Sequence, residues 1–249
     1  MNFEKTSNPA FSEGRLKKMA ESFAGTGQMT MAGTATKTLL LFALLVLTAS
    51  ITWKMVGVES PALMPCMIGG GIGALVLAIV ACIKPEKAYI FAPLYALCEG
   101  LLLGAVSAMY ASAFDGIVTS AILLTLAISA VVFLCYRMGL LRASTTFVKV
   151  ISFATIGIMV FYLLSFVLGF FGIHLSVFSL GWVGIVIQLV IVGIAALNLV
   201  LDFNNVENGI NSGVSAQFEW YFAFGLMVTL VWIYIEVLRL LAILYGRRD

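Results

Sequence analysis

Acidic residues lie inside long apolar stretches of this sequence, where an ionised side chain is costly. Glu99, Glu219 and Glu236 each fall within such a stretch, and Asp202 lies at the polar margin of another. A charge near the centre of a lipid bilayer costs at least about 2.5–3.5 kcal/mol on insertion scales, so such residues normally face the interior of a helix bundle or water. These four carboxylates are therefore the candidate functional groups of the chain.

Glu236 has two interpretations. Arg239 lies three residues further on, on nearly the same helical face, and an ion pair between the two would fix helix packing. Alternatively, Glu236 pairs with Asp202 on the preceding helix. Two carboxylates in a low-dielectric site cannot both ionise cheaply, so one of them holds a proton near neutral pH. Such a pair would sense protons or gate a cation, and Glu219 competes with Glu236 for the partner role.

The composition defines the environment in which these acids work. The chain has 249 residues, of which 62% are hydrophobic and 10% charged, whereas a soluble globular protein is about 45–50% apolar and 25% charged. The sequence therefore predicts an integral membrane protein in contact with the lipid bilayer. Long apolar segments favour helices over a β-barrel, and a net charge of only +2 argues against a nucleic-acid partner.

Seven apolar runs are each long enough to cross a hydrocarbon core about 30 Å thick. They are 38–55, 61–83, 89–111, 116–136, 150–171, 178–201 and 218–245. We expect an all-α protein with seven transmembrane helices, made of a polar tail over residues 1–36 and a membrane domain over residues 37–249. The segment 202–217 is acidic and rich in asparagine, which predicts a loop with turns at Asn208–Gly209 and Ser212–Gly213.

The distribution of lysine and arginine predicts the orientation. With the N-terminus inside, ten basic residues fall on the inner side and three on the outer side. The positive-inside rule then places the N-terminus in the cytoplasm. We also expect no cleavable signal peptide, because the N-terminal segment lacks a short apolar region with a small-residue cleavage site.

Other residues in the apolar runs are expected to serve packing. Gly100 and Gly104 have the GxxxG spacing of closely packed membrane helices. Gln188 and Asn198 are expected to hydrogen-bond neighbouring helices rather than to bind a substrate.

Several kinds of chemistry are not expected. The four cysteines lie in apolar runs without metal-ligand spacing, and His174 is the only histidine, so zinc and haem sites are not predicted. No lysine follows Lys149, which excludes a retinal Schiff base in the last helix. No HExxH or GxSxG motif occurs. We therefore expect neither an enzyme nor a bound cofactor. The cysteines are Cys66, Cys82, Cys98 and Cys135.

At its acidic motifs the chain resembles the bacterial branch of the Bax inhibitor-1 (transmembrane Bax inhibitor motif) family. The main motifs are LVLDFNN at 199–205 and WIYIEVLRLLAIL at 232–244. Supporting segments are NPAF at 8–11, IFAPLYALCEGLLLG at 90–104 and YRMGLLRASTTFVKVISFATIGIMV at 136–160.

The resemblance implies a fold with the seventh helix at its centre and a pH-sensitive calcium leak gated by acids on helices six and seven. By position, Asp202 matches the helix-six acid and Glu236 the helix-seven acid. Calcium, as the transported ion, would lie near these two residues, since carboxylate oxygens suit hard cations. Glu219, Glu99 and Arg239 are secondary candidates. The resemblance also implies a bacterial cytoplasmic (inner) membrane.

An alternative function belongs to a different class. Some bacterial relatives are implicated in modulating a membrane-bound protease, so the chain is alternatively a regulatory protein that binds a membrane-protein partner. The polar tail over residues 1–36 is the feature that bears on this alternative.

Overall fold

The computed structural model describes residues 27–172 and 181–247, and these residues are almost entirely helical. Each long helix within these ranges is long and apolar enough to cross a membrane, as the sequence predicts. The segment 8–11 and His174 lie outside the described residues. The long helices are α2 (Met31–Gly57), α3 (Leu63–Ile83), α4 (Ala88–Ala113), α5 (Ile117–Arg137), α6 (Thr145–Phe170), α7 (Trp182–Asn211) and α8 (Glu219–Tyr245).

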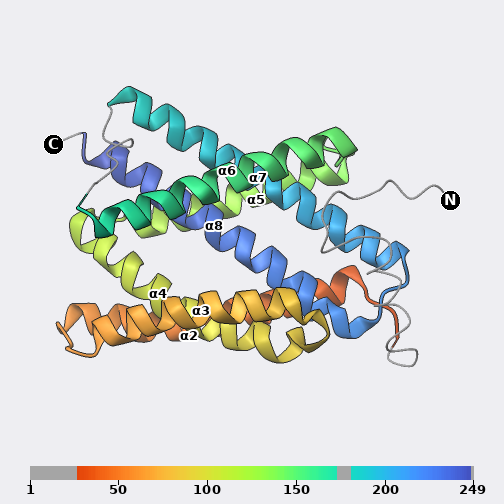
Figure 1. Cartoon of the computed structure of the whole chain (residues 1–249), viewed down its shortest axis with the longest axis horizontal. Coiled ribbons are helices and arrows are strands. Elements are labelled where there is room, and N and C mark those ends of the chain that lie inside the picture. Colours follow the sequence, from red (N-terminus) through yellow and green to blue (C-terminus); the bar gives the residue numbers. More distant parts are fainter. Residues whose placement is uncertain (1–26, 173–180, 248–249) are drawn as a thin grey trace.

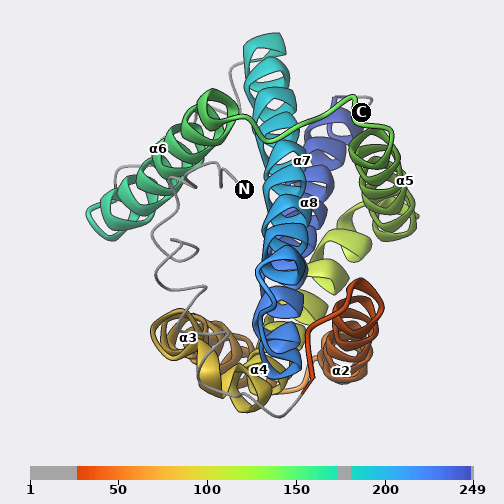
Figure 2. The same ribbon diagram turned by 90° about the vertical axis from the view of Figure 1, so that its right-hand side faces the viewer.

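The last helix, α8, lies at the centre of the bundle, as predicted. It contacts α2, α4, α5 and α7, and it crosses the molecule diagonally between the α2–α4 group and the helices α5 and α6 (Figure 1). Turned by 90°, the molecule shows α7 and α8 running side by side with the remaining helices around them (Figure 2). The α7–α8 pair is therefore the support on which the acidic residues are placed.

Helices α6 and α8 differ sharply in burial. In α8, 50% of the most apolar stretch is buried within the protein, whereas in α6 the share is 11%. Helix α6 packs mainly on α7 and leaves most of its apolar surface for lipid.

Glycines allow α4 to approach α2 closely, which confirms the prediction from the GxxxG spacing. A Cβ atom at Gly104 would lie 2.2 Å from the carbonyl oxygen of Ala49, and one at Gly100 would lie 2.3 Å from that of Leu45. Only glycine fits at these distances. Lipid supplies little hydrophobic drive between helices, so close backbone packing of this kind carries much of the association.

The predicted loop over residues 202–217 is wrong in its first part. Helix α7 continues to Asn211, so residues 202–211 form about three further helical turns. Gly209, predicted to be in a turn, lies inside the helix, where a Cβ atom would be 2.8 Å from the Met29 sulfur. The turn at Ser212–Gly213 is confirmed, and Gly213 adopts a φ of 67°.

The first span also begins earlier than the apolar run. Helix α2 starts at Met31, inside the segment predicted as a polar tail, because the hydroxyl of Thr30 caps it by accepting a hydrogen bond from the Gly33 amide at 2.9 Å. Nothing in the structure tests the division of the chain at residue 36 or the cytoplasmic position of the N-terminus, so both stay predictions.

Candidate functional site

Asp202 lies on the face of α7 that meets α8. Its carboxylate accepts a hydrogen bond from the side chain of Thr229 on α8. Its Oδ2 atom is buried and has no hydrogen-bond partner among the described residues. A buried acceptor without a partner is uncommon in folded proteins and normally has an explanation, such as a bound ion or water.

A cavity of about 850 Å³ lies in front of Asp202. Helices α6, α7 and α8 supply most of its wall, and Ala78 and Cys82 of α3 complete it. Asp202 is the only acidic residue among the lining residues. The other polar residues of the wall are Lys149, Ser152, Thr155, Asn198, Asn205, Tyr221 and Thr229.

Asn198 also lines this cavity. Its amide nitrogen donates to the hydroxyl of Thr155 at 2.7 Å and to the carbonyl of Ile194 at 2.9 Å. The first of these bonds ties α7 to α6, as predicted for a polar residue in this run. The cavity therefore combines one carboxylate with neutral oxygen atoms from hydroxyl and amide groups.

Glu236 lies in a separate place, the Glu236 cluster (Tyr162, Gln188, Trp232, Glu236 and Arg239). Tyr162 donates to both carboxylate oxygens at 2.9 and 3.0 Å. Gln188 donates to Oε2 at 2.7 Å and Trp232 to Oε1 at 3.0 Å. Arg239 completes the shell with an ion pair at 3.2 Å. Glu236 is 1% exposed, so its acceptor capacity is used within the protein.

The cluster also joins three helices. Tyr162 comes from α6, Gln188 from α7, and the other members from α8. Arg239 donates to the Tyr162 hydroxyl at 2.5 Å and lies 4.9 Å from the centre of its ring. These contacts close the α6–α8 interface and confirm the Glu236–Arg239 ion pair that was the first interpretation of these residues.

The structure does not bring Asp202 and Glu236 together, and the interpretation of the two as a contacting pair is wrong for this conformation. Asp202 hydrogen-bonds the side chain of Thr229 on α8, and Glu236 lies seven residues after Thr229 on that helix. At a rise of about 1.5 Å per residue, this separates the two levels by roughly 10 Å. The gating roles assigned to each residue stay predictions.

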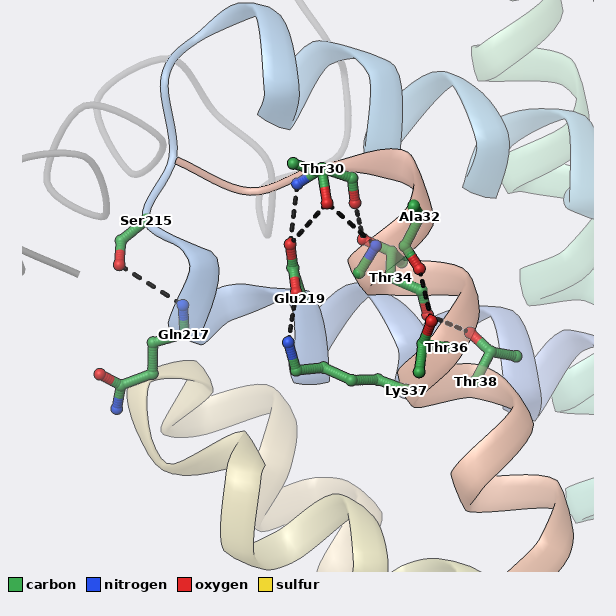
Figure 3. Close-up of polar contacts among 10 residues, drawn as sticks. Thr30, Ala32, Thr34, Thr36, Lys37, Thr38, Ser215, Gln217 and Glu219 are labelled. Atoms are coloured by element: carbon green, nitrogen blue, oxygen red, sulfur yellow. Dashed lines mark hydrogen bonds and ion pairs between the residues drawn. The ribbon is translucent and has the colours of Figure 1, made fainter. Parts of the chain in front are cut away.

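Glu219 does not pair with Asp202 either. It lies at the start of α8 and binds the start of α2, in an arrangement that we call the N-terminal clamp (Thr30, Lys37 and Glu219; Figure 3). Its Oε1 atom accepts from the backbone amide of Thr30 at 2.8 Å and from the Thr30 hydroxyl at 3.2 Å. Its Oε2 atom forms an ion pair with Lys37.

The clamp is supported by the chain on both sides of it. The Met29 amide donates to the Val214 carbonyl at 2.8 Å, and the Ala216 amide donates to the Gly27 carbonyl at 2.9 Å. A Cβ atom at Gly33 would lie 2.2 Å from the Glu219 Oε2 atom, so a larger residue there would displace the carboxylate from the clamp. The clamp gives Glu219 a structural role at the helix ends.

Glu99 is buried on α4 and hydrogen-bonds the side chain of Tyr95, one turn earlier on the same helix. The Tyr95 ring packs edge-on against Phe224 of α8, with ring centres 5.0 Å apart. Glu99 is not among the residues that line the Asp202 cavity.

The sequence interpretation missed the partners of these acids. Tyr162 and Lys37 lie far from their carboxylates in sequence, and nothing in the local pattern of either residue distinguishes it from an interfacial tyrosine or lysine. Gln188 was expected to bond a neighbouring helix, and it does. Within the described ranges, no group of three or more histidine, cysteine, aspartate or glutamate residues could hold a metal ion.

The fold and its buried acids define a polytopic helical membrane protein. A family model described as "Bax inhibitor 1 like" matches residues 8–246, which is nearly the whole chain. The chain therefore belongs to the Bax inhibitor 1 like family. No curated protein and no solved structure matches it.

Proposed function

We propose that this protein is a passive, proton-regulated leak for cations, with calcium as the expected ion and Asp202 as the main cation-binding group. The single observation that carries the proposal is the Oδ2 atom of Asp202, which has no hydrogen-bond partner in the described part of the chain and lies beside a cavity of about 850 Å³. Calcium binds carboxylate and neutral oxygen atoms in flexible geometry, and the hydroxyl and amide groups of the wall supply the neutral ones.

Protons regulate such a site by competing for the carboxylate. A protonated Asp202 loses its charge and with it most of its attraction for a cation. The conformer that binds the proton more tightly is favoured as the pH falls. The role we assign to Glu236 is different: the closed Glu236 cluster holds α6 against α8, and the leak opens when α6 moves away from α8.

Calcium flux into liposomes tests the proposal. Wild type, Asp202→Asn and Glu236→Gln are compared from about pH 5 to pH 8, the range in which physiological proton sensors work. We expect Asp202→Asn to lower the flux about tenfold, which corresponds to about 1.4 kcal/mol of lost cation binding, and to flatten its pH dependence. Asp115→Asn is the matched control, because Asp115 is exposed and does not line the cavity. Wild type that passes no calcium at any pH would overturn the proposal.

A second function is favoured by the N-terminal clamp. The polar tail leads directly into residues whose backbone is bonded to the α7–α8 connection. A membrane-protein partner that holds the tail would therefore act on that connection. Deleting residues 2–26 tests this function: loss of a cellular effect with calcium flux unchanged supports partner binding, and loss of both effects together does not.

The proposal also includes the location. We place the protein in a bacterial cytoplasmic membrane with its N-terminus inside. Reporter fusions at either end of the chain would check the orientation.

A further inference from the structure

The Asp202 cavity carries charges of both signs. Lys149 of α6 and Asp202 of α7 line it together, yet they form no ion pair with each other or with any other described residue. Two opposite charges that share a cavity without neutralising each other match a ligand that carries both charges itself.

The two charges lie at different depths. Lys149 is four residues from the start of α6, and Asp202 is nine residues from the end of α7. The hydrogen bond between Asn198 and Thr155 puts these two residues at the same level. Lys149 lies six residues from Thr155 and Asp202 four residues from Asn198 in the same direction, so at about 1.5 Å per residue Lys149 is roughly 3 Å nearer that end of the bundle. Lys149 is exposed, and a flexible lysine side chain reaches toward the membrane surface, so its ammonium lies nearer that surface than the Asp202 carboxylate does.

The cavity also opens sideways toward lipid. Phe153 and Ile156 line it, and both are largely exposed, at 73% and 54%. Helices α3 and α6 lie on the same side of the α7–α8 pair and are spread apart there (Figure 2), and each contributes to the cavity wall. The inside of the cavity is therefore continuous with the apolar surface that faces acyl chains.

We propose that this cavity binds one phospholipid with a primary-amine headgroup, of the phosphatidylethanolamine type. The ammonium group pairs with the carboxylate of Asp202, the phosphate lies at Lys149, and an acyl chain leaves between α3 and α6 along Phe153 and Ile156. The site does not depend on ion conduction, although it shares Asp202 with the proposed leak.

The charges select this headgroup over other common ones. A phosphatidylglycerol headgroup offers no donor with positive charge to Asp202. A phosphatidylcholine headgroup has a quaternary ammonium without N–H groups, so it cannot donate a hydrogen bond to the Asp202 carboxylate. Charge-assisted hydrogen bonds are about twice as strong as neutral ones, which makes the amine the selective element.

Lipid binding to the purified full-length protein, measured by native mass spectrometry, tests the proposal. The probes are phosphatidylethanolamine, phosphatidylcholine and phosphatidylglycerol with identical acyl chains. We expect phosphatidylethanolamine to bind about tenfold more tightly than either of the others, the change that one charge-assisted hydrogen bond produces.

Two variants separate the two contacts. Asp202→Asn is expected to remove the preference for ethanolamine over choline, and Lys149→Gln to weaken both lipids while keeping that preference. Lys87→Gln is the matched control, because Lys87 is exposed and does not line the cavity. Equal binding of all three lipids by wild type, or an unchanged preference in Asp202→Asn, would overturn the proposal.

A labelling measurement on wild type covers the case in which a variant does not fold. The Cys82 thiol lies on the cavity wall, whereas Cys66 lies sixteen residues away at the opposite end of α3. Phosphatidylethanolamine should slow maleimide labelling of Cys82 relative to Cys66 more than phosphatidylcholine does, and equal protection by both lipids counts against the site. If the protein passes calcium but binds all three lipids equally, the lipid site is refuted and the leak is not. If it prefers phosphatidylethanolamine but passes no calcium, the leak is refuted and the lipid site is not.

Discussion

Neutralising Glu236 should destabilise the protein through the arginine beside it. In Glu236→Gln an amide nitrogen, which donates hydrogen bonds, replaces a carboxylate oxygen that accepts them in the wild type. Arg239 also loses its ion-pair partner. Breaking a buried pair by removing one member costs about 3–5 kcal/mol. The Arg239 side chain is 31% exposed and recovers part of its hydration, so we expect about 2–4 kcal/mol.

The two charges should be coupled, and a double-mutant cycle measures the coupling. Arg239→Gln alone leaves the carboxylate with its three neutral donors, Tyr162, Gln188 and Trp232. The double variant Glu236→Gln/Arg239→Gln leaves no unpaired charge. Its cost should therefore be smaller than the sum of the two single costs by about 1–3 kcal/mol, as for residues in one hydrogen-bonded network.

Thermal unfolding in detergent provides the assay. A loss of about 1 kcal/mol lowers the melting temperature of a chain of this size by roughly 2–4 °C, so Glu236→Gln should melt about 4–16 °C below wild type. Glu86→Gln, at an exposed glutamate, should stay within about 0.5 kcal/mol of wild type. If the cycle is additive within about 0.5 kcal/mol, Glu236 and Arg239 do not form the pair described here.

The N-terminal clamp gives two further predictions. Gly33→Ala should cost about 1–3 kcal/mol in thermal unfolding, because its Cβ atom would overlap Glu219, while Gly157→Ala, where nothing lies within 4 Å of the new atom, should be neutral or stabilising. Glu219→Ala should cost about 2–4 kcal/mol, because it leaves Lys37 unpaired and the Thr30 amide without its acceptor. It should also speed amide hydrogen exchange in the first turn of α2, and unchanged exchange there would contradict the capping role.

The membrane-spanning helices could be predicted because their length and hydropathy are visible in the sequence. The ion pair of Glu236 with Arg239 could also be predicted, because a spacing of three residues on a helix is a local relation. Both predictions depend only on residues near each other in sequence.

The level of Asp202 could not be predicted, because it depends on where α7 ends. Hydropathy ends that helix at residue 201, since six of the next ten residues are acidic or asparagine. In the structure they stay helical because their contacts are tertiary: Tyr136 of α5 donates to Glu207, and Gly209 packs on Met29. Extending α7 places Asp202 well inside the bundle and at the level of Thr229 rather than Glu236.

The N-terminal clamp has a consequence for the order of synthesis. The Thr30 amide and the Glu219 carboxylate are 189 residues apart in the chain, so the first span enters the membrane long before its own first turn can be completed. Until the last span is made, Lys37 has no carboxylate of Glu219 to pair with, and the Thr30 amide lacks the Glu219 oxygen that accepts its hydrogen bond. Closure of so long a loop comes late, because its entropy cost must be met by contacts that form only then. The start of α2 therefore becomes ordered when the final helix arrives. Protection of this segment from proteases during translation would indicate that the final helix has been added.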